Sequence, residues 1–372
     1  MEASAGTIAT VAWLAFGLAF IFGAVGNKTH FCTMGAVSDI VNIGDWGRMR
    51  MWLLAIAVAI LGANILQYLG LIDLSRSIYQ TPNFAWLAYV IGGLLFGIGM
   101  TMGSGCGSKT LIRIGAGNLK SVVVFVFLAI SAYMTLRGLF GQWRVDYIQP
   151  VAIDLASKGY TGQDLPALLA GMLADRKMLA LVIACIVAGA LLAFVFAAKE
   201  FRSNFDLILG GVVVGLVVVG GWYVTGHLGY KENPETLEMT FFGTNTRAAE
   251  SFSFVAPLAY TLELLMLWTD KSLHATFGIA AVLGVIAGSL AYAIASKTFR
   301  WESFTSAADM RNHMIGGILM GFGGVTALGC TIGQGISGFS TLALGSIITF
   351  ICIVTGAAAT MKYQYWRMLQ EA

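Results

Sequence analysis

Nine apolar runs of about 17 to 22 residues follow one another along the chain, separated by breaks that carry charge. A helix needs about 20 such residues to cross a bilayer core roughly 30 Å thick. Only 11% of the residues are charged, against about 25% in a soluble domain. The sequence therefore predicts an all-α polytopic membrane protein, a single transport domain over residues 1–372. The expected spans are residues 7–26, 51–70, 84–103, 121–141, 178–198, 206–226, 275–296, 313–329 and 341–361.

The segments outside these runs have different expected roles. Pro257 and Glu263 interrupt residues 251–270, which we expect to form a partial or tilted segment. Residues 142–177 carry both signs of charge and predict a joint between two halves, whereas residues 227–250 predict an extramembrane loop or lid. The first run follows no basic region and precedes no small-residue cleavage site, so we interpret it as a span rather than a signal peptide.

The Lys and Arg residues are unevenly distributed over the breaks. If the N-terminus lies outside and residues 251–270 do not cross, thirteen of them fall in inside loops and eight in outside loops. Cytoplasmic loops carry the excess of Lys and Arg, so the C-terminus is expected in the cytoplasm. The net charge is only +3. No basic stripe lies outside the loops that flank the spans, which argues against a nucleic-acid partner.

One stretch of the chain occurs twice. Residues 91–106 (IGGLLFGIGMTMGSGC) and 315–330 (IGGILMGFGGVTALGC) agree at half of their positions, and residues 17–32 match them more loosely. The repeat predicts two pseudo-symmetric halves, at about 7–141 and 206–361. Under the expected orientation the two copies run in opposite directions. The halves would then be inverted repeats, an arrangement in which many transporters place broken helices and their substrate site near the midplane.

The chain turns polar and glycine-rich directly after the cysteine that ends each copy. Backbone in a bilayer must be hydrogen-bonded internally unless it lines a cavity or is buried in protein. We therefore expect short re-entrant helices here, each beginning at a cysteine. The amide groups at a helix start bind anions. Glycines at Gly105, Gly107, Gly329 and Gly333 would let a substrate approach these amides with no Cβ in the way.

The five cysteines divide into two groups. Cys185 and Cys352 lie inside apolar runs, where cysteine packs as a small hydrophobic residue. Cys32, Cys106 and Cys330 recur at matching places in the repeated pattern, and this recurrence predicts a functional role. A disulfide between one pair of these three remains open. No CxxC or Cys/His spacing favours a metal site, so a metal held by three thiolates is the weaker hypothesis.

Polar residues beside the cysteines add further candidates. Lys109 and Arg113 follow Cys106 and predict either positive charge for an anion or the usual basic residues of a cytoplasmic loop. Thr331 and Gln334 follow Cys330 and predict either donors to oxyanion oxygens or groups that satisfy loose main chain. Glu263 is also a candidate, because an acid inside an apolar run is costly and often functional. The four histidines fall near span ends and are interpreted as interfacial.

At the three cysteine loops the sequence resembles the YeeE/YedE sulfur-transport family of bacterial inner-membrane proteins. The resemblance is carried by HFCTMGAVSD around Cys32, GSGCGSKTLIRIGAG around Cys106, and IGGILMGFGGVTALGCTIGQGI around Cys330. It implies an hourglass-shaped protein with nine spans and short re-entrant helices that imports thiosulfate or a related sulfur compound, with the three cysteines in the path. A small soluble TusA-like sulfur carrier is the partner that it implies on the cytoplasmic side.

The resulting hypothesis is a permease of the inner membrane, not an enzyme, that passes a small sulfur anion along Cys330, Cys106 and Cys32 by weak S–H hydrogen bonds. We expect no cofactor, and the sequence has no GxxxxGK[ST] pattern for ATP. Two alternatives are left open. One is a membrane sulfurtransferase that forms a cysteine persulfide, and the other is a transporter of selenium compounds or soft metals.

Overall fold

The computed structural model describes residues 2–169, 176–234 and 236–371. Nine helices of 17 residues or more lie in this part of the chain, one for each expected span. They are α1 (Glu2–Lys28), α3 (Gly47–Tyr68), α4 (Trp86–Met102), α6 (Leu119–Arg137), α9 (Arg176–Ala197), α11 (Phe205–Tyr223), α13 (Phe277–Ala295), α14 (Ala307–Thr326) and α15 (Leu344–Glu371).

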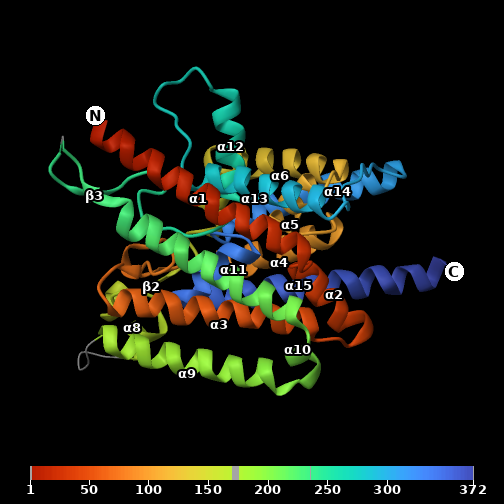
Figure 1. Cartoon of the computed structure of the whole chain (residues 1–372), viewed down its shortest axis with the longest axis horizontal. Helices are drawn as coiled ribbons and strands as arrows, with labels where there is room; N and C mark the ends of the chain where they lie inside the picture. Colours follow the sequence, from red (N-terminus) through yellow and green to blue (C-terminus); the bar gives the residue numbers. More distant parts are fainter. Residues whose placement is uncertain (1, 170–175, 235, 372) are drawn as a thin grey trace.

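The long helices form one bundle that is elongated along the helix axes (Figure 1). Within the described residues, eight spans are long and apolar enough to cross a membrane. α14 is not among them because its first two turns, AADMRNHM, are polar. The protein is therefore an all-α multi-pass membrane protein, as predicted. The two termini lie at opposite ends of the bundle, which we call the N-terminal face and the C-terminal face (Figure 1).

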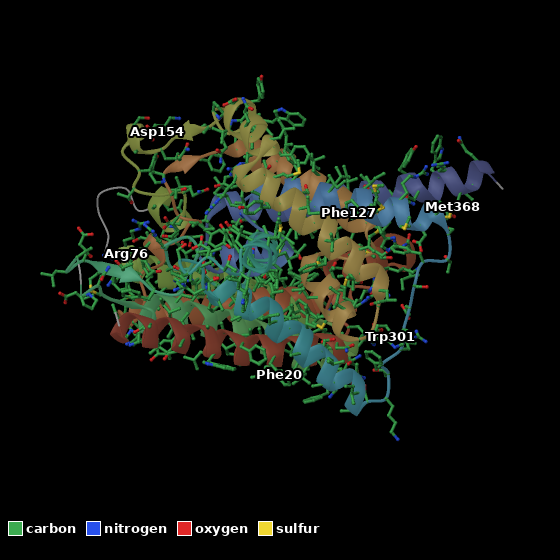
Figure 2. The ribbon with its side chains drawn as sticks, turned by 90° about the horizontal axis from the view of Figure 1, so that it is seen from above. Phe20, Arg76, Phe127, Asp154, Trp301 and Met368 are labelled. Carbon is green, nitrogen blue, oxygen red and sulfur yellow. The ribbon has the colours of Figure 1, made fainter. Side chains whose placement is uncertain are left out.

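The side chains at the two faces differ from those along the bundle. Arg76 and Asp154 lie at the N-terminal face, and Trp301 and Met368 lie at the C-terminal face (Figure 2). Large apolar side chains such as Trp13 on α1 and Ile186 on α9 are exposed along the sides, at 73% and 66% of their surface. The exposed apolar side chains along the sides fit a bundle surrounded by lipid, because lipid tails accept apolar side chains.

Short elements connect the long helices. The helical ones are α2 (Thr33–Ile43), η1 (Leu74–Arg76), α5 (Gly107–Gly115), α7 (Leu139–Trp143), η2 (Arg144–Ile148), η3 (Ala156–Lys158), α8 (Leu165–Leu169), α10 (Lys199–Ser203), η4 (Val224–Leu228), α12 (Ala256–Met266) and η5 (Gly333–Gly338). Two small antiparallel pairs join β1 (Asn83–Phe84) to β2 (Ile153–Asp154) and β3 (Tyr230–Glu232) to β4 (Met239–Phe241).

The two predicted connecting segments lie at the N-terminal face. The joint predicted at 142–177 contains η2, β2, η3 and α8, and its residues 170–175 lie outside the described residues. The loop predicted at 227–250 contains the β3–β4 hairpin, and its residue 235 also lies outside the described residues. Both pairs of strands therefore belong to the loops that cover this face.

The two copies of the repeated stretch pack against each other in opposite directions. A Cβ added to Gly92 on α4 would lie 2.6 Å from the carbonyl oxygen of Gly323 on α14, and one added to Gly99 would lie 2.7 Å from that of Gly316. Glycine is required at these positions because the two backbones approach within contact distance. The pairing runs 92 with 323 and 99 with 316, so α4 and α14 are antiparallel, as the sequence predicted.

The interrupted segment 251–270 forms a partial helix. α12 has only 11 residues and stands across the direction of the long helices (Figure 1), and a helix of this length rises about 17 Å, too little to span the core. Its acid, Glu263, accepts a hydrogen bond from the Tyr133 hydroxyl at 3.1 Å and pairs with Arg137 at 3.3 Å, both on α6. Glu263 therefore attaches α12 to α6.

Candidate functional site

The same backbone turn precedes each of the three loop cysteines. Two residues before the cysteine, the chain adopts a left-handed conformation, with φ of 53° at His30, 56° at Ser104 and 61° at Leu328. The amide of the following residue then donates a hydrogen bond to a carbonyl in the last turn of the long helix. The pairs are Phe31 to Gly26 (3.1 Å), Gly105 to Met100 (2.9 Å) and Gly329 to Gly324 (2.7 Å). This is the Schellman ending of a helix, which satisfies its last carbonyl groups.

Each cysteine then begins a short helix. Cys32 caps α2, Cys106 caps α5, and Cys330 precedes the helical residues 331–340, which include η5. The expectation that a long helix breaks and a short one starts at each cysteine is therefore confirmed. Three helix N-termini, each carrying partial positive charge from its free amides, are placed at the three thiols.

The sulfur atoms are held by these helix starts. The sulfur of Cys32 accepts a hydrogen bond from the Gly35 amide at 3.4 Å. The sulfur of Cys330 accepts from the amides of Gly333 at 3.4 Å and Phe254 at 3.3 Å. Cys106 instead lies 3.3 Å from the Ser108 hydroxyl. All three side chains are buried, with at most 6% of their surface exposed.

Phe254 connects the Cys106 and Cys330 loops. Its amide contacts the Cys330 sulfur, and a Cβ on Gly107 would lie 2.7 Å from its carbonyl oxygen. Its ring lies 5.6 Å from that of Phe22 on α1, which in turn contacts the ring of Phe31 beside Cys32. The thiol of Cys106 lies near those of Cys32 and Cys330. Three loops that are far apart in the sequence therefore meet close to Phe254.

Two of the four loop glycines have a different role from the one expected. A Cβ on Gly333 would lie 2.5 Å from the Ser253 hydroxyl, and Gly107 meets the Phe254 backbone. Side-chain atoms of Lys109 and Gln334 lie 3.2 Å from the Cβ positions of Gly105 and Gly329. At Gly107 and Gly333 the space expected for a substrate is filled by protein, and glycine there allows segments to pack tightly around the cysteines. At Gly105 and Gly329 the nearest neighbours are side-chain atoms at 3.2 Å, and access for a substrate stays a prediction.

The hydroxyl groups next to two cysteines have no partner. The side-chain oxygens of Thr33 and Thr331 are buried without a hydrogen bond to any described residue. Gln334 donates its amide hydrogen to the Ala327 carbonyl, while its own side-chain oxygen has no partner in the same part of the chain. The side-chain NH₂ group of Gln334 therefore satisfies a main-chain carbonyl of the loop, whereas its oxygen remains without a partner among the described residues. A buried hydroxyl without a partner is costly and could bond to a bound molecule.

Positive charge surrounds Cys106 and Cys32. The Lys109 ammonium lies near both thiols and forms no ion pair or hydrogen bond among the described residues. Arg113 donates to the Ser104 carbonyl at 2.6 Å, and Arg48 pairs with Asp39. Of these three basic residues, Lys109 is thus the one whose charged group has no acceptor among the described residues. Its charge is therefore free to interact with a bound anion.

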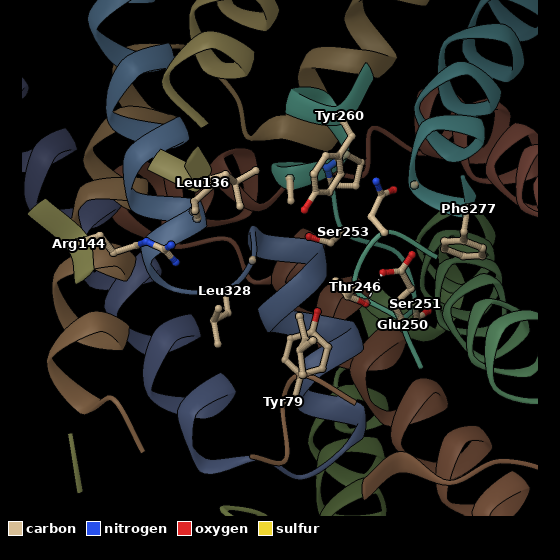
Figure 3. A pocket seen from close by; sticks show the side chains of 18 residues that line it. Tyr79, Leu136, Arg144, Thr246, Glu250, Ser251, Ser253, Tyr260, Phe277 and Leu328 are labelled. Carbon is tan, nitrogen blue, oxygen red and sulfur yellow. Dashed lines mark hydrogen bonds between the residues drawn. The ribbon is translucent and has the colours of Figure 1, made fainter. Parts of the chain in front are cut away.

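Among the cavities next to the cysteine loops, two lie beside the turns that precede the cysteines. One of about 180 Å³ is lined by Leu328 and Gly329, directly before Cys330, and by side chains from the loops of the N-terminal face (Figure 3). The other, of about 340 Å³, is lined by His30 and Arg113 together with Lys28 and Arg300. The first cavity therefore adjoins the Cys330 loop, and the second adjoins the Cys32 and Cys106 loops and is predominantly basic.

The remaining cysteines differ from this group. Cys352 is half-buried, with its Cβ 2.8 Å from the Cβ position of Gly93, as expected for packing. Cys185 is exposed on α9, so the expectation that it is buried was wrong. All five thiols are free, and no disulfide joins any pair. The described residues contain no group of three or more His, Cys, Asp or Glu that could hold a metal ion.

A protein-family model described as sulphur transport matches residues 28–359, which include all three cysteine loops. The chain belongs to the sulphur transport family. Two relatives are each named thiosulfate transporter TsuA. That of Escherichia coli (strain K12) is 24% identical over 95% of this chain and 94% of its own length. That of Spirochaeta thermophila is 24% identical over 92% of this chain and 96% of its own length. This family member is therefore comparable to both relatives in length.

Sequence reasoning missed three parts of this family member's site. The left-handed residues His30, Ser104 and Leu328 carry no sequence signal, because glycine or asparagine normally occupies such positions. Phe254 lies in the interrupted segment 251–270 and was not connected with the cysteines. The cavity beside Leu328 is formed by loops that are far apart in the sequence, so no local pattern could have predicted it.

Proposed function

We propose that the protein imports thiosulfate, or a closely related small sulfur anion, along a path marked by Cys330, Cys106 and Cys32. One observation carries the proposal: three cysteines each begin a short helix, Phe254 joins the Cys330 sulfur to the start of α5, and the Cys106 thiol lies near that of Cys32. Helix starts favour anions, and thiols suit a sulfur-containing one. Membership of the sulphur transport family and the names of the two relatives support the same substrate class.

The contacts of the Cys330 sulfur favour non-covalent transfer. Two backbone amides donate to this sulfur, so its own S–H proton remains available to donate to an anion. The unpartnered Thr331 hydroxyl beside it supplies a second donor. Further along the path, Lys109 offers an unpaired positive charge close to Cys106 and Cys32. The anion would then leave through the basic cavity that contains His30 and Arg113.

The test is growth on thiosulfate as the only sulfur source, in a strain that cannot take up sulfate. Wild-type protein should restore growth, whereas Cys106→Ala and Cys330→Ala should not. Cys185→Ala and Cys352→Ala are matched controls, because these cysteines lie outside the Phe254 group, and they should grow like wild type. Unimpaired growth of both loop variants at equal protein level would exclude the proposed path.

The same variants separate the alternative functions. A sulfurtransferase would gain the mass of one sulfur atom on Cys106 or Cys330 after exposure to thiosulfate, and a reductant would remove it. Thiosulfate import by weak hydrogen bonds leaves the mass unchanged. Competition of labelled thiosulfate uptake by selenite and by copper(I) tests the remaining alternative. Stronger inhibition by either one than by unlabelled thiosulfate would assign a different substrate.

We place the protein in the bacterial inner membrane with its C-terminus in the cytoplasm. The excess of Lys and Arg in the loops assigned to the inside supports this orientation. The C-terminal face also carries the basic cavity, as expected of a cytoplasmic side. A reporter enzyme that is active only in the cytoplasm, fused after α15, should be active. A reporter that is active only in the periplasm should be inactive there.

A TusA-like carrier is the proposed acceptor on the cytoplasmic side. The basic cavity, lined by Lys28, Arg113 and Arg300, would deliver the anion to the face at which such a carrier could dock. Co-purification of a tagged chain with the carrier, lost on mutation of Lys28 and Arg300 to Glu, would support this partner. Thiosulfate uptake that is equally fast in vesicles with and without the carrier would exclude it as an obligatory component.

A further inference from the structure

The cavity beside the Cys330 loop contains an arginine without an acid. The side-chain Nε of Arg144, at the start of η2, is buried and has no hydrogen-bond partner among the described residues. None of the carboxylates in that part of the chain forms an ion pair with Arg144. The guanidinium lines the cavity from one side (Figure 3). The Arg144 side chain is half-buried, and a buried N–H group without an acceptor is costly. An anion bound in the cavity would supply that acceptor.

Three hydroxyl groups line the space next to Arg144. They belong to Tyr79, Ser253 and Tyr260, which come from three separate segments, and they point toward the centre of the cavity (Figure 3). None of the three hydroxyls donates or accepts a hydrogen bond within the described residues. The cavity volume of about 180 Å³ is many times the roughly 10–15 Å³ that one water molecule needs on the same measure. The cavity is therefore large enough for a small oxyanion. The Arg144 guanidinium and the three hydroxyl groups could all donate hydrogen bonds to it.

An acid lies across the cavity from Arg144. Glu250 accepts a hydrogen bond from the Thr246 hydroxyl at 2.9 Å and forms no ion pair among the described residues. The titratable groups that face it are the hydroxyls of Tyr79 and Tyr260, both neutral. Burial raises the pKa of Glu250 from 4.5 to about 7, because a low-dielectric environment disfavours the charged form. Glu250 thus changes charge close to neutral pH.

We propose that this cavity is an outer anion-binding site, in which Arg144 and the hydroxyls of Tyr79, Ser253 and Tyr260 hold the anion while Glu250 carries a proton. The proposal rests on the proposed function, since it takes thiosulfate as the anion and the Cys330 loop as its next position. An ionised Glu250 would repel a dianion, whereas the protonated carboxyl adds a donor. The site therefore selects an anion together with one proton.

The linkage between anion and proton sets the direction of the pH effect. Below about pH 7 Glu250 is already protonated, so thiosulfate binding is independent of pH. Above it the anion must bring a proton with it, and affinity falls by up to about tenfold per pH unit. Thiosulfate itself stays fully ionised over this range. The change therefore comes from the protein.

The test is thiosulfate binding to the purified full chain by calorimetry, at pH 6.0 and 8.5. Wild type should bind at least tenfold more weakly at pH 8.5. Glu250→Gln should bind equally, within about twofold, at both values. Arg144→Gln should lose at least tenfold in affinity at both, and Arg144→Lys should recover most of that loss. Glu238→Gln and Lys158→Gln are matched controls on exposed residues of the same face, and both should behave like wild type.

Two results would overturn the outer site. One is a Glu250→Gln variant that keeps the wild-type loss of affinity at high pH, and the other is an Arg144→Gln variant that keeps wild-type affinity. If Arg144→Gln does not fold, Tyr260→Phe decides, with an expected loss of about threefold to tenfold. If wild type imports and binds thiosulfate while these variants match it, only the outer site fails. If wild type neither imports nor binds thiosulfate, the proposed function itself fails.

Discussion

After Cys106 the chain continues into Lys109 and Arg113, whereas after Cys330 it continues into the neutral Thr331 and Gln334. Both loops nevertheless have the same left-handed turn, the same closing amide bond and the same cysteine at the start of a short helix. The duplicated backbone therefore provides two equivalent helix starts, and the side chains that follow give them different charges.

The difference in charge suggests different roles for the two loops. The Cys330 loop adjoins the cavity with one arginine and one acid, where an anion can be selected. The Cys106 loop lies near Lys109, Arg113 and Arg48, which under the proposed function would draw an anion onward toward the C-terminal face. Increasing positive charge along a path lowers the energy of an anion step by step. Four predictions test this comparison, in order of decreasing expected effect.

The tight packing of both loops should be the feature most sensitive to mutation. Gly107→Ala and Gly333→Ala each place a Cβ 2.5 to 2.7 Å from protein atoms, and overpacking of this kind costs about 1–3 kcal/mol. Both variants should therefore unfold at lower temperature in detergent. Gly189→Ala is the control, because nothing lies within 4 Å of its Cβ position on α9. Equal unfolding temperatures for all three variants would show that the loops are loosely packed.

The charge beside the Cys330 loop should also affect stability. The pKa of Glu250 is raised to about 7 when folded, above its unfolded value, so the folded state holds its proton more tightly. The resulting stability is complete below about pH 4.5 and is lost as the pH rises to 7. The loss is about 2 kcal/mol, after allowance for partial solvent contact. Glu250→Gln should therefore unfold at a higher temperature than wild type at pH 8, and at the same temperature at pH 4.5.

The positive charge beside Cys106 should matter more for import than the neutral amide beside Cys330. Lys109→Gln is expected to lower the initial rate of thiosulfate uptake about tenfold, equivalent to about 1.4 kcal/mol, while Lys109→Arg keeps most of the rate. Gln334→Ala is the matched change in the other loop and should cost less than threefold. A larger loss of uptake in vesicles for Gln334→Ala than for Lys109→Gln would contradict the different roles assigned to the two loops.

The left-handed turns should give the smallest effect. Leucine in this left-handed conformation is strained by about 1–2 kcal/mol, and glycine would remove that strain. Glycine also loses more conformational entropy on folding than leucine does, which cancels part of the gain. Leu328→Gly should therefore stabilise the protein by less than about 1 kcal/mol, and Ser104→Gly should behave similarly. The β-branched change Leu328→Val should destabilise it instead. Chemical denaturation of the three variants measures the difference, and a destabilising Leu328→Gly would show that the leucine side chain outweighs the strain.

The parts of the fold that could be predicted depend on local pattern. Eight of the nine long helices in the described part of the chain are apolar enough to cross a membrane, so length and composition predicted them. The antiparallel pairing of α4 and α14 followed from the repeat and from the distribution of Lys and Arg. The break at each cysteine was predicted because polar, glycine-rich chain cannot continue a lipid-exposed helix.

The parts that were missed depend on contacts between distant segments. The roles of Gly107 and Gly333 were wrong because their neighbours, Phe254 and Ser253, come from a segment about 80 to 150 residues away. Cys185 could not be distinguished from a buried cysteine, because an apolar run in a membrane is the same whether it faces lipid or protein. Arg144 and Glu250 were separated by more than 100 residues of chain, so neither suggested the other.

Phe254 has one further consequence. Its amide is bonded to the Cys330 thiol, and its carbonyl is pressed against Gly107. Under the proposed path, an anion that took this amide's place at the sulfur would disturb a residue that also packs against the start of α5. Binding at one thiol could then be felt at the next through a single residue, without rotation of whole helices.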